Sequence, residues 1–132
     1  MARHAAADLF LDTLPYNAHT TASDALWAGL PLVTCAGSTF AGRVAASLLR
    51  AAGLAELVTS NLQEYEALAF KLASEHSLLQ SIRQKLVDHR STCPLFDSDR
   101  FRRHIEAAYE TMWSIHCRGE APRNFRVDPI DV

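Results

Sequence analysis

The sequence predicts an α/β fold with short parallel strands in its first half and helices alone in its second. Two observations carry this prediction. Up to about residue 60, short apolar segments of strand length alternate with amphipathic segments of helix length. Beyond residue 60 only the helical spacing of apolar residues continues. The order strand–helix–strand–helix–strand is typical of half of a doubly wound domain, whose strands run parallel.

The first strand is predicted over residues 8–12, an apolar run that we expect to be buried. A loop follows at residues 14–17, where proline and asparagine favour a turn. The next helix is predicted from about residue 21 to 28, and Gly29 supplies its stop signal. Trp27 fits the apolar pattern of this helix, so we expect its side chain in the core.

The second strand is predicted over residues 32–34. Small residues at 36–39 then form a loop at its carboxyl end. A helix from about residue 41 to 52 stops at Gly53, and residues 56–58 form a weak third strand.

Three helices are predicted after residue 60. Asn61 with Glu64 makes a capping box for the first, and Asp97 or Ser98 caps the last, which Gly119 ends. Each helix has one apolar face. In the first it consists of Leu62, Tyr65, Leu68, Ala69 and Leu72, and in the second of Leu78, Leu79, Ile82 and Leu86. In the last it consists of Phe101, Ile105, Ala108, Tyr109, Met112 and Trp113.

The composition limits the classes of partner. Of 132 residues, 48% are hydrophobic and 21% charged, as in a globular protein with a modest core. The net charge of −2 and the lack of a basic patch argue against a nucleic-acid partner. No apolar run approaches the roughly 20 residues of a membrane span, so no membrane partner is expected.

The cysteines indicate the compartment. Cys35, Cys93 and Cys117 are odd in number and lack metal-site spacing, so we interpret them as reduced thiols of a cytoplasmic protein. A metal site built from Cys117 with His116 or His104 is the less favoured alternative, and no metal is expected.

The motif with the clearest chemistry is His19-Thr20-Thr21-Ala22-Ser23-Asp24. It follows the first predicted strand and opens the next helix. Backbone N–H groups and the dipole at a helix start bind anions, and two threonines add hydroxyl donors. An aspartate one turn further on suits a neutral hydroxylated group such as ribose. The motif therefore predicts a site for a nucleotide diphosphate at the carboxyl end of a parallel sheet.

A structural interpretation competes with this one. Thr21 and Asp24 also have capping-box spacing, with the threonine as N-cap and the carboxylate three residues later. Caps greatly outnumber phosphate sites, so the motif alone favours a cap. The two interpretations are compatible because an anion site needs an ordered helix start.

Five segments, taken in order and spacing, give a specific resemblance. Residues 8–13, 19–34, 43–47, 63–66 and 91–96 together resemble the end of the catalytic region of the O-linked N-acetylglucosamine transferase family, glycosyltransferase family 41. The likeness covers roughly residues 3–118. It implies the C-terminal half of a Rossmann-like GT-B donor-binding domain followed by a helical tail.

The resemblance also implies a division of the chain. Residues 1–60 would be the latter half of the nucleotide-sugar-binding Rossmann-like domain, and residues 61–120 the C-terminal helices that pack on it. Residues 121–132 would form a loose tail. The earlier strands and the N-terminal catalytic domain of the family would lie upstream.

Five residues acquire roles by resemblance. Thr20 and Thr21 would donate hydrogen bonds to the diphosphate of the donor, and His19 would lie near the same phosphates. Asp24 would bind the ribose hydroxyls. Arg3 would lie near the base. The competing interpretations are an exposed arginine near the chain start for Arg3 and a loop histidine bonded to backbone for His19.

Family members move N-acetylglucosamine from UDP to serine or threonine hydroxyls of proteins. Their general base, their acceptor groups and a lysine for the diphosphate lie upstream of the matched segment, so no catalytic residue is assigned here. We expect a nucleotide sugar and a protein acceptor as partners, and no cofactor or metal. We expect the isolated chain to be inactive and to self-associate through an uncovered strand edge.

Two alternatives remain open from the sequence. One is a non-catalytic interaction module, a truncated remnant that docks through its helical tail. The other is a different GT-B enzyme of nucleotide sugars, such as an epimerase, whose fold is shared but whose motif spacing is not.

Overall fold

The computed structural model describes residues 2–130; Met1 and residues 131–132 lie outside the described part. The chain forms two compact units, one ending at Leu95 and one beginning at Phe96. In chain order the elements are η1 (Ala2–Ala6), β1 (Phe10–Leu11), α1 (Thr20–Trp27), β2 (Leu32–Cys35), α2 (Val44–Ala51), η2 (Ala55–Leu57), β3 (Val58–Thr59), α3 (Leu62–Ser74), α4 (His76–His89) and α5 (Ser98–Cys117).

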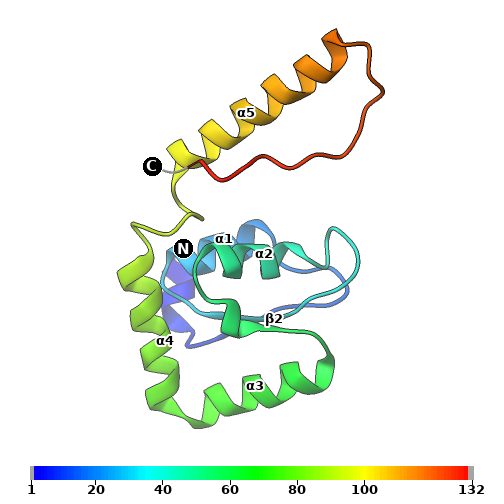
Figure 1. The fold of residues 1–132 in the computed structure, drawn as a ribbon. Coiled ribbons are helices and arrows are strands. Elements are labelled where there is room, and N and C mark those ends of the chain that lie inside the picture. The colour runs from blue at the N-terminus through cyan, green and yellow to red at the C-terminus, as the bar shows by residue number, and fades with distance from the viewer. Residues whose placement is uncertain (1, 131–132) are drawn as a thin grey trace. The chain divides into compact units, whose positions relative to one another are not determined.

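The first unit is built on a parallel three-stranded sheet with the order β1-β2-β3. Phe10 pairs with Leu32, and Thr34 pairs with Val58. Helices α1 and α2 lie on one face of the sheet and α3 on the other (Figure 1). The predicted alternation of strands and helices is confirmed. The third strand begins two residues later than expected, because η2 occupies the preceding residues.

Strand β2 is the centre of this core. All four of its residues are buried, as a parallel strand covered on both faces requires. Leu26 of α1 and Leu49 of α2 are fully buried against it from one side, and Leu72 of α3 from the other. Helices α1 and α2 end at Gly29 and Gly53, as predicted, with φ angles of +81° and +75° that favour glycine.

Strand β1 differs from its prediction. It pairs with β2 along one edge, and no other strand within residues 2–130 pairs with its second edge. Leu11 is consequently 51% exposed, so the expectation that this strand is buried is wrong for that residue. A strand that lacks one neighbour exposes side chains and backbone groups that a second strand would cover.

Two further expectations about side chains are wrong. Trp27 is 43% exposed, and the guanidinium carbon of Arg90 lies 5.1 Å from its ring centre. Leu62 is 64% exposed because it is the first residue of α3, whereas Leu72 further along the helix is buried. The cap of α3 is as predicted: Asn61 Oδ1 accepts a hydrogen bond of 2.9 Å from the Glu64 N–H.

Helix α4 confirms its predicted apolar face, since Leu79, Ile82 and Leu86 are buried. It packs against α3 within the first unit. Among the described residues, no helix has the length and apolar character needed to cross a membrane.

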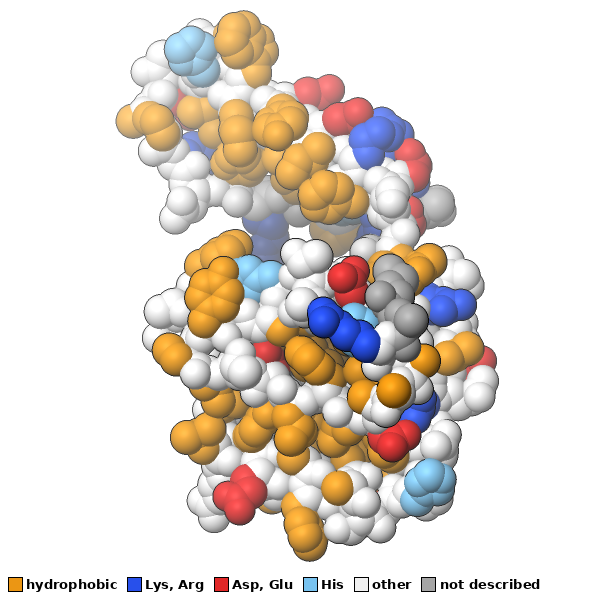
Figure 2. Space-filling model, turned by 180° about the vertical axis from the view of Figure 1, so that it is seen from behind, with side chains coloured by type: hydrophobic (Ala, Val, Ile, Leu, Met, Phe, Trp, Pro, Cys, Tyr) orange, Lys and Arg blue, Asp and Glu red, His pale blue; other side chains and the backbone are white. Residues whose placement is uncertain are grey.

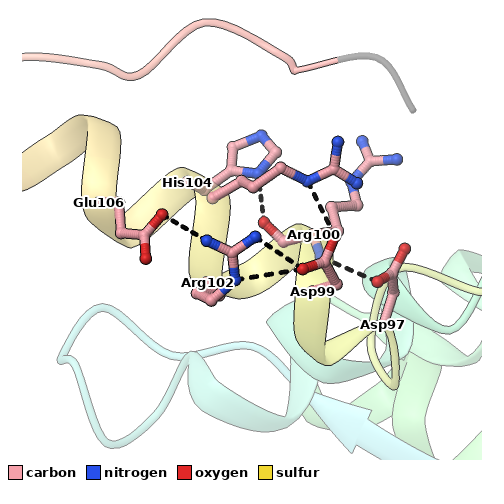
Figure 3. Close-up of polar contacts among 7 residues, drawn as sticks. Asp97, Asp99, Arg100, Arg102, His104 and Glu106 are labelled. Atoms are coloured by element: carbon pink, nitrogen blue, oxygen red, sulfur yellow. Dashed lines mark hydrogen bonds and ion pairs between the residues drawn. The ribbon is translucent and has the colours of Figure 1, made fainter.

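The second unit consists of α5 and the segment that follows it. Asp97 caps the helix, with Oδ1 accepting from the Arg100 N–H at 2.8 Å. Figure 3 shows Arg102 between Asp99 and Glu106, with N···O distances of 2.7 and 2.6 Å. Such exposed pairs each add little stability. Gly119, with φ of +70°, ends the helix as predicted.

The predicted apolar stripe of α5 lies largely at the surface. Phe101, Tyr109, Met112 and Trp113 are each at least half exposed, and Ile115 is the buried residue of the helix. Residues 120–130 have no regular structure, and the Ile130 N–H lies 3.3 Å from Nε2 of His104. Whether 61–120 and 121–132 behave as separate parts stays a prediction.

Candidate anion site at the start of α1

The start of α1 presents free backbone donors. The helix begins at Thr20, and His19 precedes it with φ −107° and ψ −91°. No side chain caps this end. The N–H groups of the first helical residues have no partner inside a helix, so those of Thr20, Thr21 and Ala22 point outward from the helix end. Both threonines are exposed.

The capping-box interpretation of Thr21 and Asp24 is wrong. The Ser23 N–H bonds to the His19 carbonyl at 3.1 Å, so His19 is the N-cap and the helix begins two residues earlier than a box capped by Thr21 requires. Thr21 is therefore a helical residue, and Asp24 lies beyond the position from which a carboxylate reaches back to the N-cap. The hydroxyls of Thr20 and Thr21 are not used as caps.

The ring of His19 lies between two exposed aromatic residues. It stacks on Tyr16, with ring centres 4.8 Å apart and planes at 21°. Phe40 approaches it edge-on, at 6.2 Å and 87°. Nε2 lies 3.4 Å from the Ala41 carbonyl oxygen, which can only accept, so this contact favours a proton on Nε2. The ring is thus oriented by both neighbouring loops.

These two loops follow β1 and β2 and join into one surface. The Asn17 N–H of the first loop donates to the Ala41 carbonyl of the second at 3.1 Å, and within the second loop the Gly37 N–H donates to the Gly42 carbonyl at 2.6 Å. A Cβ on Gly42 would lie 3.2 Å from both the Pro15 carbonyl oxygen and the Gly37 Cα. A side chain at Gly42 would therefore require the neighbouring backbone to shift by a few tenths of an ångström.

Four of the five predicted site residues come together. His19, Thr20 and Thr21 form the helix start, and Asp24 lies one turn further along α1, half-buried. Arg3 is exposed and lies in η1, which precedes β1, whereas the other four follow β1. Its role near a nucleotide base stays a prediction.

Sequence reasoning missed Asp12, a buried carboxylate beneath the site. It is 6% exposed and follows β1 directly. Its backbone carbonyl accepts a 2.8 Å hydrogen bond from the Tyr65 hydroxyl of α3. Burial, and after it the electrostatic influence of Asp12 and Cys35, raises the pKa of Tyr65, which favours the neutral phenol that donates this bond. The sequence feature that could have identified Asp12 is an acidic residue directly after an apolar strand.

The site offers hydrogen-bond donors and a helix dipole rather than metal ligands. Within residues 2–130, no three His, Cys, Asp or Glu side chains lie close enough to hold a metal ion. Donors fixed by the backbone can stabilise an anion without reorganising, and they can stabilise charge that develops on a leaving phosphate.

Comparison with known proteins decides the family. The model of glycosyl transferase family 41 matches residues 1–105. This chain belongs to glycosyl transferase family 41. The resemblance seen in the motifs is confirmed, and family membership disfavours the epimerase alternative.

Individual relatives agree. The chain is 43% identical over 131 residues to the probable UDP-N-acetylglucosamine–peptide N-acetylglucosaminyltransferase SEC of Arabidopsis thaliana, covering 98% of this chain and 13% of the relative. It is 40% identical over 128 residues to the probable enzyme of the same description, SPINDLY, of Oryza sativa subsp. japonica, covering 97% and 14%. The chain therefore spans about a seventh of these relatives.

A solved structure confirms the fold. A mutant of the O-GlcNAc transferase of Thermobaculum terrenum superposes with a TM-score of 0.84 at 39% identity, covering 91% of this chain and 23% of that one. The predicted class, the C-terminal part of a GT-B domain of α/β type with helices after it, matches this family 41 fold.

Proposed function

We propose that this family 41 segment binds the diphosphate of a nucleotide-sugar donor, UDP-N-acetylglucosamine, for transfer of the sugar to serine or threonine of proteins by a longer glycosyltransferase. The observation that carries the proposal is the helix start with exposed Thr20 and Thr21 and no side-chain cap. The relatives described above are probable UDP-N-acetylglucosamine–peptide N-acetylglucosaminyltransferases, and the proposed substrates follow from that similarity.

Each residue has a distinct task in this proposal. The amides and hydroxyls of Thr20 and Thr21 donate to the diphosphate, and they stabilise the charge that builds on it as the sugar–phosphate bond breaks. His19 lies beside the same phosphates. Asp24, a carboxylate, would repel them and therefore binds ribose hydroxyls. Arg3 contacts the base.

The proposal assigns binding to this segment and no general base. An acceptor hydroxyl must lose a proton during transfer, and that group, like the acceptor site, is assigned to other parts of the longer protein. No cofactor or metal is required. The compartment proposed is the cytoplasm, which the free thiols of Cys35, Cys93 and Cys117 favour.

Calorimetry with UDP and uridine tests the proposal. UDP should bind more tightly than uridine, and replacing both Thr20 and Thr21 by alanine should remove most of the difference, about 1–3 kcal/mol. Thr92→Ala is the control, since the Thr92 hydroxyl is exposed and bonds to the His89 carbonyl in the turn after α4.

Equal affinity for UDP and uridine in this chain, and in an Arabidopsis SEC protein in which the chain replaces the matching segment, would refute the proposal. The chimaera supplies the parts of the relatives that this chain does not match.

One observation favours a second function, docking to another protein. Figure 2 shows hydrophobic side chains gathered on the surface of the unit that contains α5. Phe101, Tyr109 and Trp113 are among the more exposed large hydrophobic side chains of the described residues. If docking is the function of the chain, UDP does not bind, and replacing these three residues by serine abolishes capture of the partner without affecting the fold of the first unit.

A further inference from the structure

Asp12 connects both ends of the loop that leads into α1. Its Oδ1 accepts from the Thr13 N–H at 2.9 Å and from the Ala18 N–H at 2.7 Å. Its Oδ2 accepts from the Thr34 hydroxyl of β2 at 2.6 Å. A carboxylate buried to this degree is costly unless it is fully hydrogen-bonded, and these three donors satisfy it.

The bond to Ala18 matters most for the site. Ala18 immediately precedes His19, the residue from which α1 starts. Because Thr34 belongs to the fully buried central strand, Asp12 transmits the fixed position of β2 to the backbone just before the helix. A shift of Ala18 would move the outward-pointing amides of Thr20 and Thr21 with it.

Buried Asn17 gives a second link of the same kind. Its side-chain amide donates to the Thr13 carbonyl at 3.0 Å, and its backbone N–H donates to the Ala41 carbonyl of the second loop. Asp12 therefore fixes the loop from the sheet side, and Asn17 fixes it from the side of the neighbouring loop.

We propose that Asp12 is a positioning residue of the anion site: it acts through Ala18 to aim the first amides of α1 at the diphosphate and does not itself contact the nucleotide. This inference rests on the proposed function. It predicts that the hydrogen-bonding geometry of the side chain is what matters, and that its negative charge is not.

The variants separate geometry from charge. Asp12→Asn keeps an oxygen acceptor for the Thr13 and Ala18 amides, so UDP affinity should stay within about threefold of wild type. Asp12→Ala removes the acceptor and should weaken UDP binding by about tenfold or more. If the charge acted directly on the nucleotide, the asparagine and alanine variants would change affinity alike.

A matched pair of threonines tests the same connection with smaller changes. Thr34→Val removes the hydroxyl that holds Asp12, whereas Thr59→Val removes a buried hydroxyl that donates to the Thr34 carbonyl at 3.0 Å and does not touch Asp12. Both should lose similar stability, but Thr34→Val should weaken UDP binding more. This pair remains informative if Asp12→Ala fails to fold.

Amide hydrogen exchange supplies a readout without nucleotide. The Ala18 N–H should be protected in wild type and in Thr59→Val, and it should exchange at least tenfold faster in Asp12→Ala or, should that variant not fold, in Thr34→Val. The inference would be overturned if Ala18 protection were unchanged in Asp12→Ala and Thr34→Val. It would also be overturned if these two variants folded and bound UDP as tightly as wild type. Failure of wild type to bind UDP, with the exchange results as expected, would instead refute the proposed function and leave the loop-positioning step supported.

Discussion

Asp24→Asn separates recognition of the ribose from support of the helix. A carboxylate that accepts from ribose hydroxyls contributes about 1.5–3 kcal/mol, and a neutral amide in its place contributes about 0.5–1.5 kcal/mol. The difference of about 1 kcal/mol corresponds to about a fivefold loss of UDP affinity. Because Asp24 lies past the first turn of α1 and is not a cap, stability should change by less than about 0.5 kcal/mol, or about 2 °C in Tm.

The assay is calorimetry with UDP and with its 2′,3′-dideoxy analogue, alongside thermal unfolding. Wild type should prefer UDP, and Asp24→Asn should lose most of that preference. Asp88→Asn on α4 is the control, since Asp88 is exposed and accepts from Gln84 at 2.7 Å on a different helix. A fall in Tm above about 5 °C with an unchanged preference for UDP would show that Asp24 supports the fold and does not read the ribose.

Two further predictions concern pH and association. The pKa of Tyr65 is raised in the folded chain by burial and then by Asp12 and Cys35, so its contribution to stability is fully present below the ordinary tyrosine pKa of about 10 and is lost as pH rises through the raised value. Unfolding by urea at pH 8 to 11 should therefore show a smaller alkaline loss of stability for Tyr65→Phe than for wild type, and identical pH slopes would contradict this. The isolated chain should self-associate through the open edge of β1 and should not transfer sugar from UDP-N-acetylglucosamine to a protein acceptor. Its mass in solution, measured with a Leu11→Lys variant as comparison, tests this, and a stable monomer with genuine turnover would defeat it.

Local patterns predicted most of the fold because local chemistry sets most of it. Gly29 and Gly53 end their helices by adopting positive φ, and Asn61 begins α3 by accepting from Glu64, all within a few residues. The sequence predicted the start of α1 at about residue 21, whereas the helix begins at Thr20. Threonine at a cap position and threonine inside a first turn look alike in sequence. The backbone bond from Ser23 to His19 distinguishes them.

Long-range contacts account for what the sequence did not predict. Asp12 bonds to Thr34, 22 residues away, and to Ala18 across a loop, so no short motif reports that it is buried and satisfied. Trp27 follows an apolar pattern, yet it is exposed, and Arg90, far along the chain, lies over its ring. The aromatic neighbours of His19 likewise come from two different loops.

The proposed diphosphate site has little positive charge of its own. A helix start supplies about half a positive elementary charge, and amides and hydroxyls add dipoles but no net charge. A diphosphate carries at least two negative charges, and Asp24 adds another on the same helix. If the segment binds a diphosphate as proposed, these groups can orient it but do not neutralise it. We then expect another part of the longer protein to supply a cation, so binding by this chain alone should be weaker than binding by the chimaera even if every proposed contact is correct.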